Sequence, residues 1–222
     1  MKYTSEYTAY HQDCLVLTPR KRRHTATFLY VEIGLVLVRL GKQDIPVYAG
    51  QGFWLPFDCL YALMITPHTS LHQLTVSPRV TVSLPQSAGH VIPSTLLHAG
   101  LTALDPLSGA NQNTPATRRL HGVLLDQLVT LSPAIANDAS YQCVAACVDQ
   151  ANAGRPLEGD NAHFTFQACT QLTYSALCEY LTVRQLRAQL KSGNKLEAAA
   201  TSLGLSYDVA LALSDEYHAV LA

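Results

Sequence analysis

The sequence predicts an α+β protein in which a small antiparallel β-structure, a sandwich or barrel, is followed by an all-helical region. Between Thr25 and Val82, short runs rich in Val, Leu, Ile, Tyr and Phe are separated by Gly and Pro. From Ala134 onward the apolar residues recur at helical spacing instead. Strand-like and helix-like runs do not alternate, which argues against Rossmann and TIM-barrel enzymes.

The runs that predict strands are rich in β-branched and aromatic residues and are bounded by turn residues. They cover residues 27–32, 34–41, 45–48, 52–56, 60–65, 70–76 and 79–84. Gly34, Gly41, Gly50 and Gly52 fall where tight turns would need a residue without a side chain.

The residue pattern changes near Val91, where Pro93 and Ser94 precede the run 95–104. Residues 105–115 are polar and rich in Gly, Asn, Ser and Pro, which predicts a loop or linker. The segment 117–131 has the spacing of an amphipathic helix, which packs either on the core or on a second subunit. Helix breaks are predicted at 152–161, 192–194 and Gly204. We therefore expect three parts: a sensor or dimerisation barrel at 1–86, a linker with interdomain helices at 87–136, and a helical region at 137–222.

Composition excludes several functional classes. With 222 residues, 48% of them hydrophobic, the chain can bury a sizeable core. The longest apolar stretch, 28–40, is interrupted by Glu32 and Arg39 and is too short to span a bilayer, so we expect a cytoplasmic protein without a membrane partner. The six cysteines form no CxxC pair and are expected to be reduced thiols, although Cys143 and Cys147 lie one helical turn apart. GxSxG, P-loop, GxGxxG and HExxH motifs are missing, which favours a protein that is not an enzyme.

The most informative stretch is 195–213, which has the pattern of a helix-turn-helix. Leu196, Ala199, Ala200 and Leu203 form one apolar face of a first helix. Gly204 supplies a left-handed turn residue, and an apolar second helix follows it. The small residue four positions before this glycine allows the two helices to cross closely.

The chain resembles the AraC/XylS family of transcription regulators. The segment 180–193, with Arg184, Leu186, Ala188 and Gly193, looks like the linker helix that precedes the second helix-turn-helix of that family. The stretch 50–56, GlyGlnGlyPheTrpLeuPro, is similar to a strand of its cupin-like sensor, and residues 91–97 and 124–128 lie where its interdomain helices do.

This resemblance implies a cupin-like antiparallel β-barrel that binds a small effector or dimerises, and a helical part that binds duplex DNA. The candidate effector ligands inside the barrel are Phe28, Tyr30, Trp54, Tyr61 and Leu63. The candidate DNA contacts are Arg184, Arg187, Lys191, Lys195, Ser206 and Tyr207. No cofactor and no metal are expected, since Ala26 and Tyr61 stand where metal-binding cupins have histidines. A homodimer, or a pair with a related regulator, is the expected assembly.

Departures from the family pattern leave a second hypothesis open. The first helix-turn-helix is shortened, and no Lys or Arg occurs after Lys195. Each lost phosphate contact weakens duplex binding, so the chain could instead regulate through protein contact. The basic stripe from Arg184 to Lys195 and the cluster 20–23 (Arg-Lys-Arg-Arg) are either solvated surfaces or sites for nucleic acid or an acidic partner.

Overall fold

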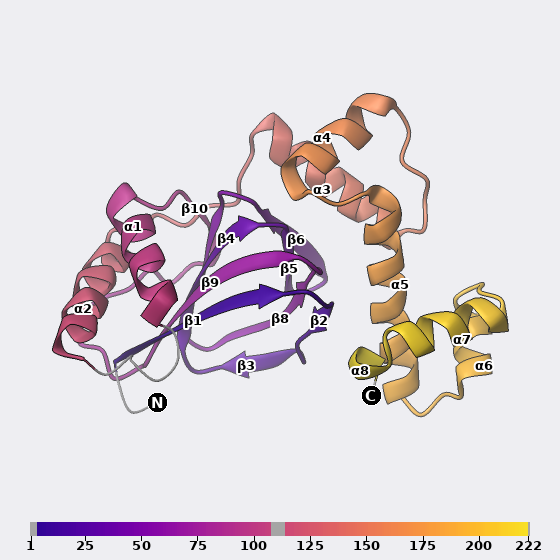
Figure 1. Ribbon diagram of the computed structural model, residues 1–222, viewed down its shortest axis with the longest axis horizontal. Helices are drawn as coiled ribbons and strands as arrows, with labels where there is room; N and C mark the ends of the chain where they lie inside the picture. The colour runs from indigo at the N-terminus through magenta and orange to yellow at the C-terminus, as the bar shows by residue number, and fades with distance from the viewer. Residues whose placement is uncertain (1–3, 108–113, 222) are drawn as a thin grey trace.

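The computed structural model describes residues 4–107 and 114–221, and within them the chain forms a mixed α+β structure whose strands all precede its α-helices (Figure 1). The strands are β1 (Ser5–Gln12), β2 (Val16–Leu17), β3 (Lys21–Arg23), β4 (Ala26–Ile33), β5 (Leu35–Leu40), β6 (Gln43–Tyr48), β7 (Gly52–Leu55), β8 (Cys59–Ile65), β9 (Thr69–Val76) and β10 (Gly89–Val91). The α-helices are α1 (Thr95–Leu104), α2 (Pro115–Val129), α3 (Ala139–Asn152), α4 (Asp160–Thr170), α5 (Tyr174–Lys191), α6 (Leu196–Ser202), α7 (Tyr207–Glu216) and α8 (His218–Leu221). A 3-10 turn, Asp105–Leu107, follows α1.

The strands form two separate antiparallel sheets. The first has the order β1-β9-β4-β7-β10, and the second has the order β2-β8-β5-β6 with β3 also paired to β8. Among the described residues no ladder joins the two sheets, so the predicted closed barrel is wrong and the strands form a sandwich. The physical reason is that consecutive strands β4 and β5 belong to different sheets, and the chain crosses from one to the other at Gly34.

Gly34 is required at this crossing for two reasons. Its φ of +90° lies in the region that side chains disfavour. A Cβ atom there would also lie 2.5 Å from Oγ1 of Thr69. The hydroxyl of Thr66 donates to the Leu35 carbonyl at 2.9 Å and anchors the start of β5.

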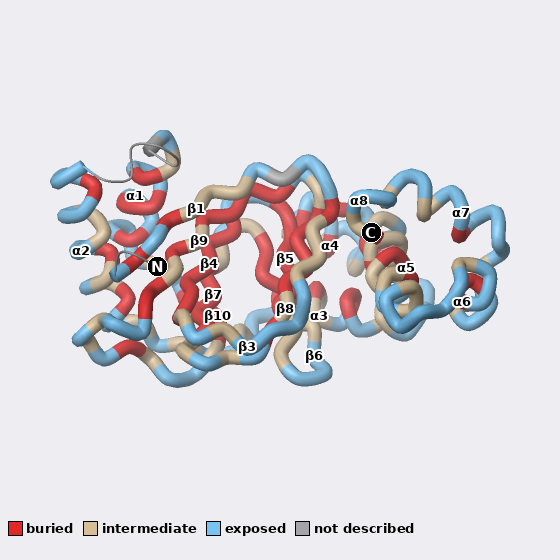
Figure 2. The backbone as a smooth tube through the Cα atoms, turned by 90° about the horizontal axis from the view of Figure 1, so that it is seen from below, coloured by how far each residue is buried: buried red, intermediate tan, exposed pale blue. Residues whose placement is uncertain are grey.

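Both faces of both sheets are covered, in the order α1–α2, first sheet, second sheet and α3–α5 (Figures 1 and 2). Successive side chains of a strand point to opposite faces, and in β4 Phe28 belongs to the cluster under α1 and α2 while Leu29 packs between the sheets. In β5, Val36 faces the space between the sheets while Leu37 packs with α3, α4 and α5. Strands buried on both faces explain the nearly unbroken apolar run in this part of the sequence.

Most predicted elements agree with the structure, and the differences have local causes. The helix breaks predicted at 152–161, 192–194 and Gly204 separate α3 from α4, α5 from α6 and α6 from α7, whereas the break at 171–173 between α4 and α5 was not predicted. The strand predicted at 79–84 is irregular, because Leu84 packs under the helices and the Trp54 indole donates to the Pro85 carbonyl at 2.9 Å. β1, β2, β3 and β10 were not predicted, since they are short or rich in polar residues. Of the predicted linker 105–115, residues 108–113 lie outside the described residues.

Two further predictions concern membrane-spanning helices and the redox state of the cysteines. No helix among the described residues has the length and apolar character needed to cross a bilayer. All six cysteines are unpaired, and Cys14 is exposed while the others are at least partly buried. Burial raises the pKa of the Cys147 thiol to about 12, so this group stays protonated at neutral pH.

Candidate functional site: the junction between the sandwich and the helical region

Helix α5 is fastened to the second sheet by an ion pair. Arg184 donates from Nη1 to Oδ1 of Asp44 at 3.0 Å and from Nη2 to Oδ2 at 2.7 Å. Asn152 of α3 takes part through its own bonds to Asp44 and Arg184, at 3.1 and 2.8 Å. The Asp44 side chain is 3% exposed and that of Arg184 is 18% exposed, so this bidentate pair is largely shielded from water. One predicted DNA contact, Arg184, therefore holds α5 against β6.

Arg187, one turn further along α5, makes a second fastening. Its Nη1 donates to the Leu17 carbonyl of β2 at 2.6 Å, and its buried Nε finds no hydrogen-bond partner among the described residues. Beside it lies a cavity of about 180 Å³ between the sheet and α5. The cations around this cavity are Arg39, Arg184, Arg187 and Lys191. Whether Arg184 and Arg187 also reach DNA stays a prediction, since their guanidinium groups already bond to the sandwich.

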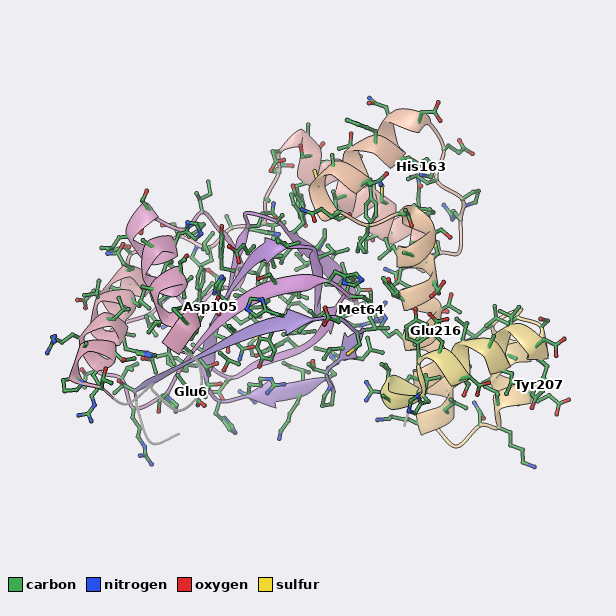
Figure 3. All side chains as sticks on the ribbon, viewed as in Figure 1. Glu6, Met64, Asp105, His163, Tyr207 and Glu216 are labelled. Atoms are coloured by element: carbon green, nitrogen blue, oxygen red, sulfur yellow. The ribbon has the colours of Figure 1, made fainter. Side chains whose placement is uncertain are left out.

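The remaining predicted DNA contacts lie beyond this junction. Lys191 and Lys195 are exposed at the end of α5 and before α6. Ser206 is the N-cap of α7, where its hydroxyl accepts from the Val209 N–H at 3.3 Å. Tyr207 is 51% exposed and projects from the outer part of the helical pair (Figure 3). All four residues are exposed, and their contact with DNA stays a prediction.

Helices α6 and α7 form the predicted helix-turn-helix pair. Gly204 sits between them with a φ of +69°, and Ala199, Ala200 and Ala210 are the buried small residues at the crossing. Tyr217, after α7, donates its hydroxyl proton to Oε1 of Glu179 and so ties the pair back to α5. The orientation of the pair is therefore set by α5.

His90 in β10 connects the sandwich to the segment that leads into α3. Its Nε2 donates to the Pro46 carbonyl at 2.9 Å, and its Nδ1 accepts from the Ala136 N–H at 3.2 Å. These bonds require a neutral ring with the proton on Nε2. Burial lowers the pKa of His90, and the hydrogen bond to Pro46 offsets part of this effect. The ring also contacts Phe53 and Tyr141 edge-on, so it joins two strands, the connecting segment and α3.

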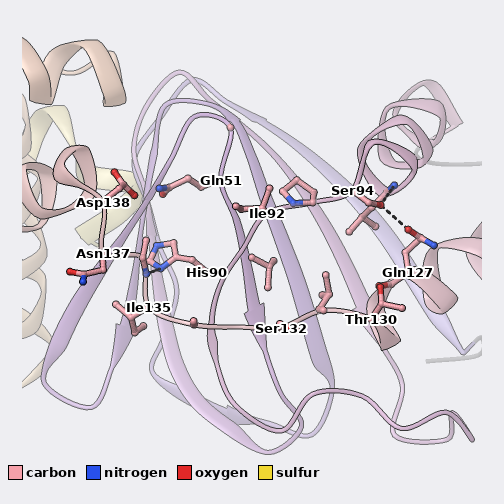
Figure 4. A pocket seen from close by; sticks show the side chains of 17 residues that line it. Gln51, His90, Ile92, Ser94, Gln127, Thr130, Ser132, Ile135, Asn137 and Asp138 are labelled. Carbon is pink, nitrogen blue, oxygen red and sulfur yellow. Dashed lines mark hydrogen bonds between the residues drawn. The ribbon is translucent and has the colours of Figure 1, made fainter.

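Next to His90 is a larger cavity of about 800 Å³, between the start of α1, the end of α2 and the segment 130–138 (Figure 4). Its polar side chains are mostly uncharged and include Gln51, Ser94, Gln127 and Ser132. Ser94 donates to Oε1 of Gln127 at 2.7 Å across this site. The carboxylate among its lining residues, Asp138, caps α3 by accepting from the Tyr141 N–H at 3.0 Å. The cavity thus suits an uncharged molecule with both apolar and hydrogen-bonding groups.

The structure divides the five predicted effector ligands between two apolar layers. Phe28, Tyr30 and Trp54 lie in the cluster beneath α1 and α2. Tyr61 and Leu63 lie between the two sheets. None of the five lines the 800 Å³ cavity, and Leu63 lines the 180 Å³ cavity. Their role as effector ligands stays a prediction.

A polar network on the first sheet was not predicted from the sequence. Tyr7 and His72 are joined by a hydrogen bond of 2.6 Å between the hydroxyl and Nδ1, and His72 Nε2 lies 3.4 Å from a Glu32 carboxylate oxygen. Ser70 donates to the same Glu32 oxygen at 3.1 Å. Glu32 is therefore paired through both Ser70 and His72. Within residues 4–107 and 114–221, no group of three or more His, Cys, Asp or Glu is arranged to hold a metal ion.

Sequence reasoning missed His90 and Asp44 as junction residues. Both lie in short strands and contact residues more than 40 positions away, so no local spacing marks them. A weak signal was available for Asp44, because it interrupts an otherwise apolar strand pair next to Pro46.

Comparison with known proteins gives only distant likenesses. No protein-family model matches the chain, and no curated protein matches its sequence. Among solved structures, the apo form of a ToxT variant from Vibrio cholerae has a TM-score of 0.41 at 9% identity, over 100% of this chain and 99% of that one. The AraC-like transcriptional activator CuxR has a TM-score of 0.37 at 13% identity, over 89% and 78%. The cupin domain of an XRE family transcriptional regulator from Enterobacter cloacae has a TM-score of 0.29 at 14% identity, over 34% and 84%. At such scores these likenesses carry no weight for function, which has to rest on the residues of this chain.

Proposed function

We propose that the chain is an AraC-type transcription regulator, not an enzyme, in which a cupin-like β-sandwich at 1–86 controls a DNA-binding helical region at 137–222 through connecting helices at 87–136. The observation that carries this proposal is the junction at α5. This helix continues into the α6–α7 pair, and its Arg184 is held by the sandwich residue Asp44. Any change in the sandwich that moves β6 is therefore transmitted to the orientation of the helix-turn-helix.

A salt series tests the DNA-binding part. The purified chain is titrated against labelled duplex from its own upstream region and against scrambled duplex, with fluorescence anisotropy as the readout. We expect affinity that falls steeply with salt, because each neutralised phosphate contributes about 0.9 to the slope of log K against log salt. Removal of Lys191 and Lys195 should make this slope shallower. Loss of binding in Arg184→Ala alone is not diagnostic, since this change also breaks the junction.

The effector in this proposal is an uncharged small molecule that binds in the 800 Å³ cavity. A volume of this size falls within the range of about 300–1,000 Å³ that small-molecule sites occupy. The cavity borders Ala136, whose N–H bonds to His90, and Asp138, which caps α3, so an occupant reaches the segment that positions the helical region. A thermal-shift screen with uncharged compounds should give hits that Ser132→Trp abolishes. The control Ser87→Trp, at an exposed site that does not line the cavity, should retain them.

The same proposal includes a homodimer through the exposed face of α2. Ala116, Arg119, Val123, Asp126 and Val129 are exposed along one side of this helix. If two copies pack antiparallel, Arg119 faces Asp126 and Ala116 faces Val129 of the second copy, which makes the face self-complementary. Analytical ultracentrifugation should show a dimer that Val123→Glu converts to a monomer.

A second candidate function is regulation by protein contact without DNA binding. It is favoured by one observation, namely that Glu197, Asp208, Asp215 and Glu216 lie in α6–α7 while no Lys or Arg follows Lys195. Failure of the folded dimer to bind any duplex at low salt would favour this function over the first.

A further inference from the structure

We infer that duplex DNA also contacts the sandwich, along a basic row formed by Arg20, Lys21 and Arg22 at the start of β3. This inference rests on the proposed DNA-binding function and deepens it, because it names a surface outside the helix-turn-helix. Phosphate oxygens of the DNA backbone are the ligand, so the contact is independent of base sequence.

The first argument is a shortage of positive charge in the helical region. Arg184 and Arg187 bond to the sandwich, which leaves Lys191 and Lys195 as the exposed cations of α5 and the segment after it. The following residues contain carboxylates and no Lys or Arg. Even with Arg155, exposed between α3 and α4, three phosphate contacts are few beside the roughly 6–10 of a firmly bound regulator, so further cations have to come from another surface.

The second argument is the exposure of the basic row. Arg20, Lys21 and Arg22 are all exposed. β3 pairs with β8 and with no other strand of the described residues, so its outer edge is open. Arg22 Nε donates to the Asp58 carbonyl at 3.1 Å and lies 3.7 Å from a carboxylate oxygen of Asp58, so part of the charge of Arg22 is offset, although its side chain is 67% exposed. Arg20 and Lys21 are therefore the main cations of the row.

The third argument is continuity with α5. Pro19, directly before Arg20, lines the 180 Å³ cavity together with Arg187 and Lys191. The basic row therefore begins beside the C-terminal half of α5. Figure 1 shows β3 along the lower edge of the sandwich and the C-terminal end of α5 in the lower part of the helical region. The Asp44 carboxylate at this junction is 3% exposed and already paired with Arg184, so it does not cancel the surface charge. Lys191, Arg20, Lys21 and Arg22 form one positive surface that crosses from the helical region to the sandwich.

The experiment compares salt slopes of the full chain and its variants on scrambled duplex, with circular dichroism as the check of folding. Arg20→Gln/Lys21→Gln removes two charges of the basic row. Lys42→Gln/Arg79→Gln removes two exposed charges of the sandwich outside the basic row and serves as the matched control. We expect the first variant to lower the magnitude of the slope by about 2, and the control to leave it unchanged.

The possible outcomes separate this inference from the proposed function. If the wild type binds and the basic-row variant keeps the full slope while Lys191→Gln/Lys195→Gln loses it, the inference is overturned and the proposed function stands. If the folded wild type binds no duplex even at low salt, both fail. A slope reduced in the basic-row variant and unchanged in the control supports the inference.

Discussion

The two outer faces of the sandwich are covered in different ways. On the first sheet, α1 and α2 pack through apolar side chains such as Leu97, Leu101 and Leu124, and Gly100 lets Leu124 approach closely. On the second sheet, apolar packing by α3 and α5 is supplemented by the Asp44–Arg184 ion pair and by Arg187. Apolar packing is non-directional and hard to break locally, whereas an ion pair is lost when its geometry changes. We therefore expect the first face, here called the fixed face, to stay in place when the second, here called the responsive face, loosens.

The largest effect is expected from Leu124→Ala on the fixed face. Leu124 is fully buried, so its truncation leaves a cavity and should lower the free energy of unfolding by about 3–4 kcal/mol. Urea denaturation measures this change. Leu96→Ala, at an exposed position of the neighbouring helix α1 and outside the proposed dimer face, should lower the free energy of unfolding by less than about 0.5 kcal/mol. Equal losses in the two variants would show that α2 is not tightly packed.

On the responsive face, Asp44→Ala should lower the free energy of unfolding by about 2 kcal/mol. This is less than the ~3–5 kcal/mol expected for breaking a fully buried ion pair, because Arg184 retains some contact with water. Hydrogen exchange should show that amides of α5 lose protection while β4 and β9 keep theirs. Arg39→Ala is the control, because Arg39 lies 3.7 Å from the same carboxylate and its side chain is 40% exposed. A uniform loss of protection throughout the chain would mean that the two faces unfold together.

Ser206→Ala removes the N-cap of α7 and should destabilise this helix by about 1 kcal/mol. The change should appear as faster exchange of the first amides of α7, with the sandwich unaffected. Ser214→Ala, inside the same helix, should not produce it. If both serine variants behave alike, the cap does not set the stability of the helix-turn-helix.

The smallest effect is a pH dependence at His90. Its pKa in the folded chain is below the usual 6.5, so the unfolded chain takes up the proton first as the pH falls. The stabilisation is thus complete above pH 6.5 and declines as the pH drops toward the folded pKa. In thermal melts at a series of pH values, His90→Gln should flatten this decline, and His68→Gln, at an exposed position, should not. An unchanged profile in His90→Gln would assign the pH dependence to other groups.

Local patterns predicted much of the secondary structure, because helix breaks and strand turns are encoded by neighbouring residues. Gly204 and the small residues at the α6–α7 crossing are examples. The pairing of Asp44 with Arg184 joins positions 140 residues apart, and no spacing rule reports it. Apolar and polar residues alternate at 79–84 and wrongly predicted a strand, because an irregular segment that packs under helices can show the same alternation. The predicted effector ligands are apolar, mostly aromatic residues of strands, yet the 800 Å³ cavity is lined largely by connecting segments.

The apolar outer face of the second sheet also governs how the molecule responds to cleavage. Leu35, Leu37, Tyr48 and Met64 are covered by the helices that follow residue 138, and Met64 lies on the side of the sandwich that faces them (Figure 3). A protease cut within 130–138, followed by separation of the two pieces, would expose this apolar surface to water. The free-energy cost would be about 1.5–3 kcal/mol for each large side chain. We expect the released amino-terminal piece to precipitate or to recapture its partner piece, which gel filtration after limited digestion would reveal. The helices after residue 138 therefore shield the apolar outer face of the second sheet from water.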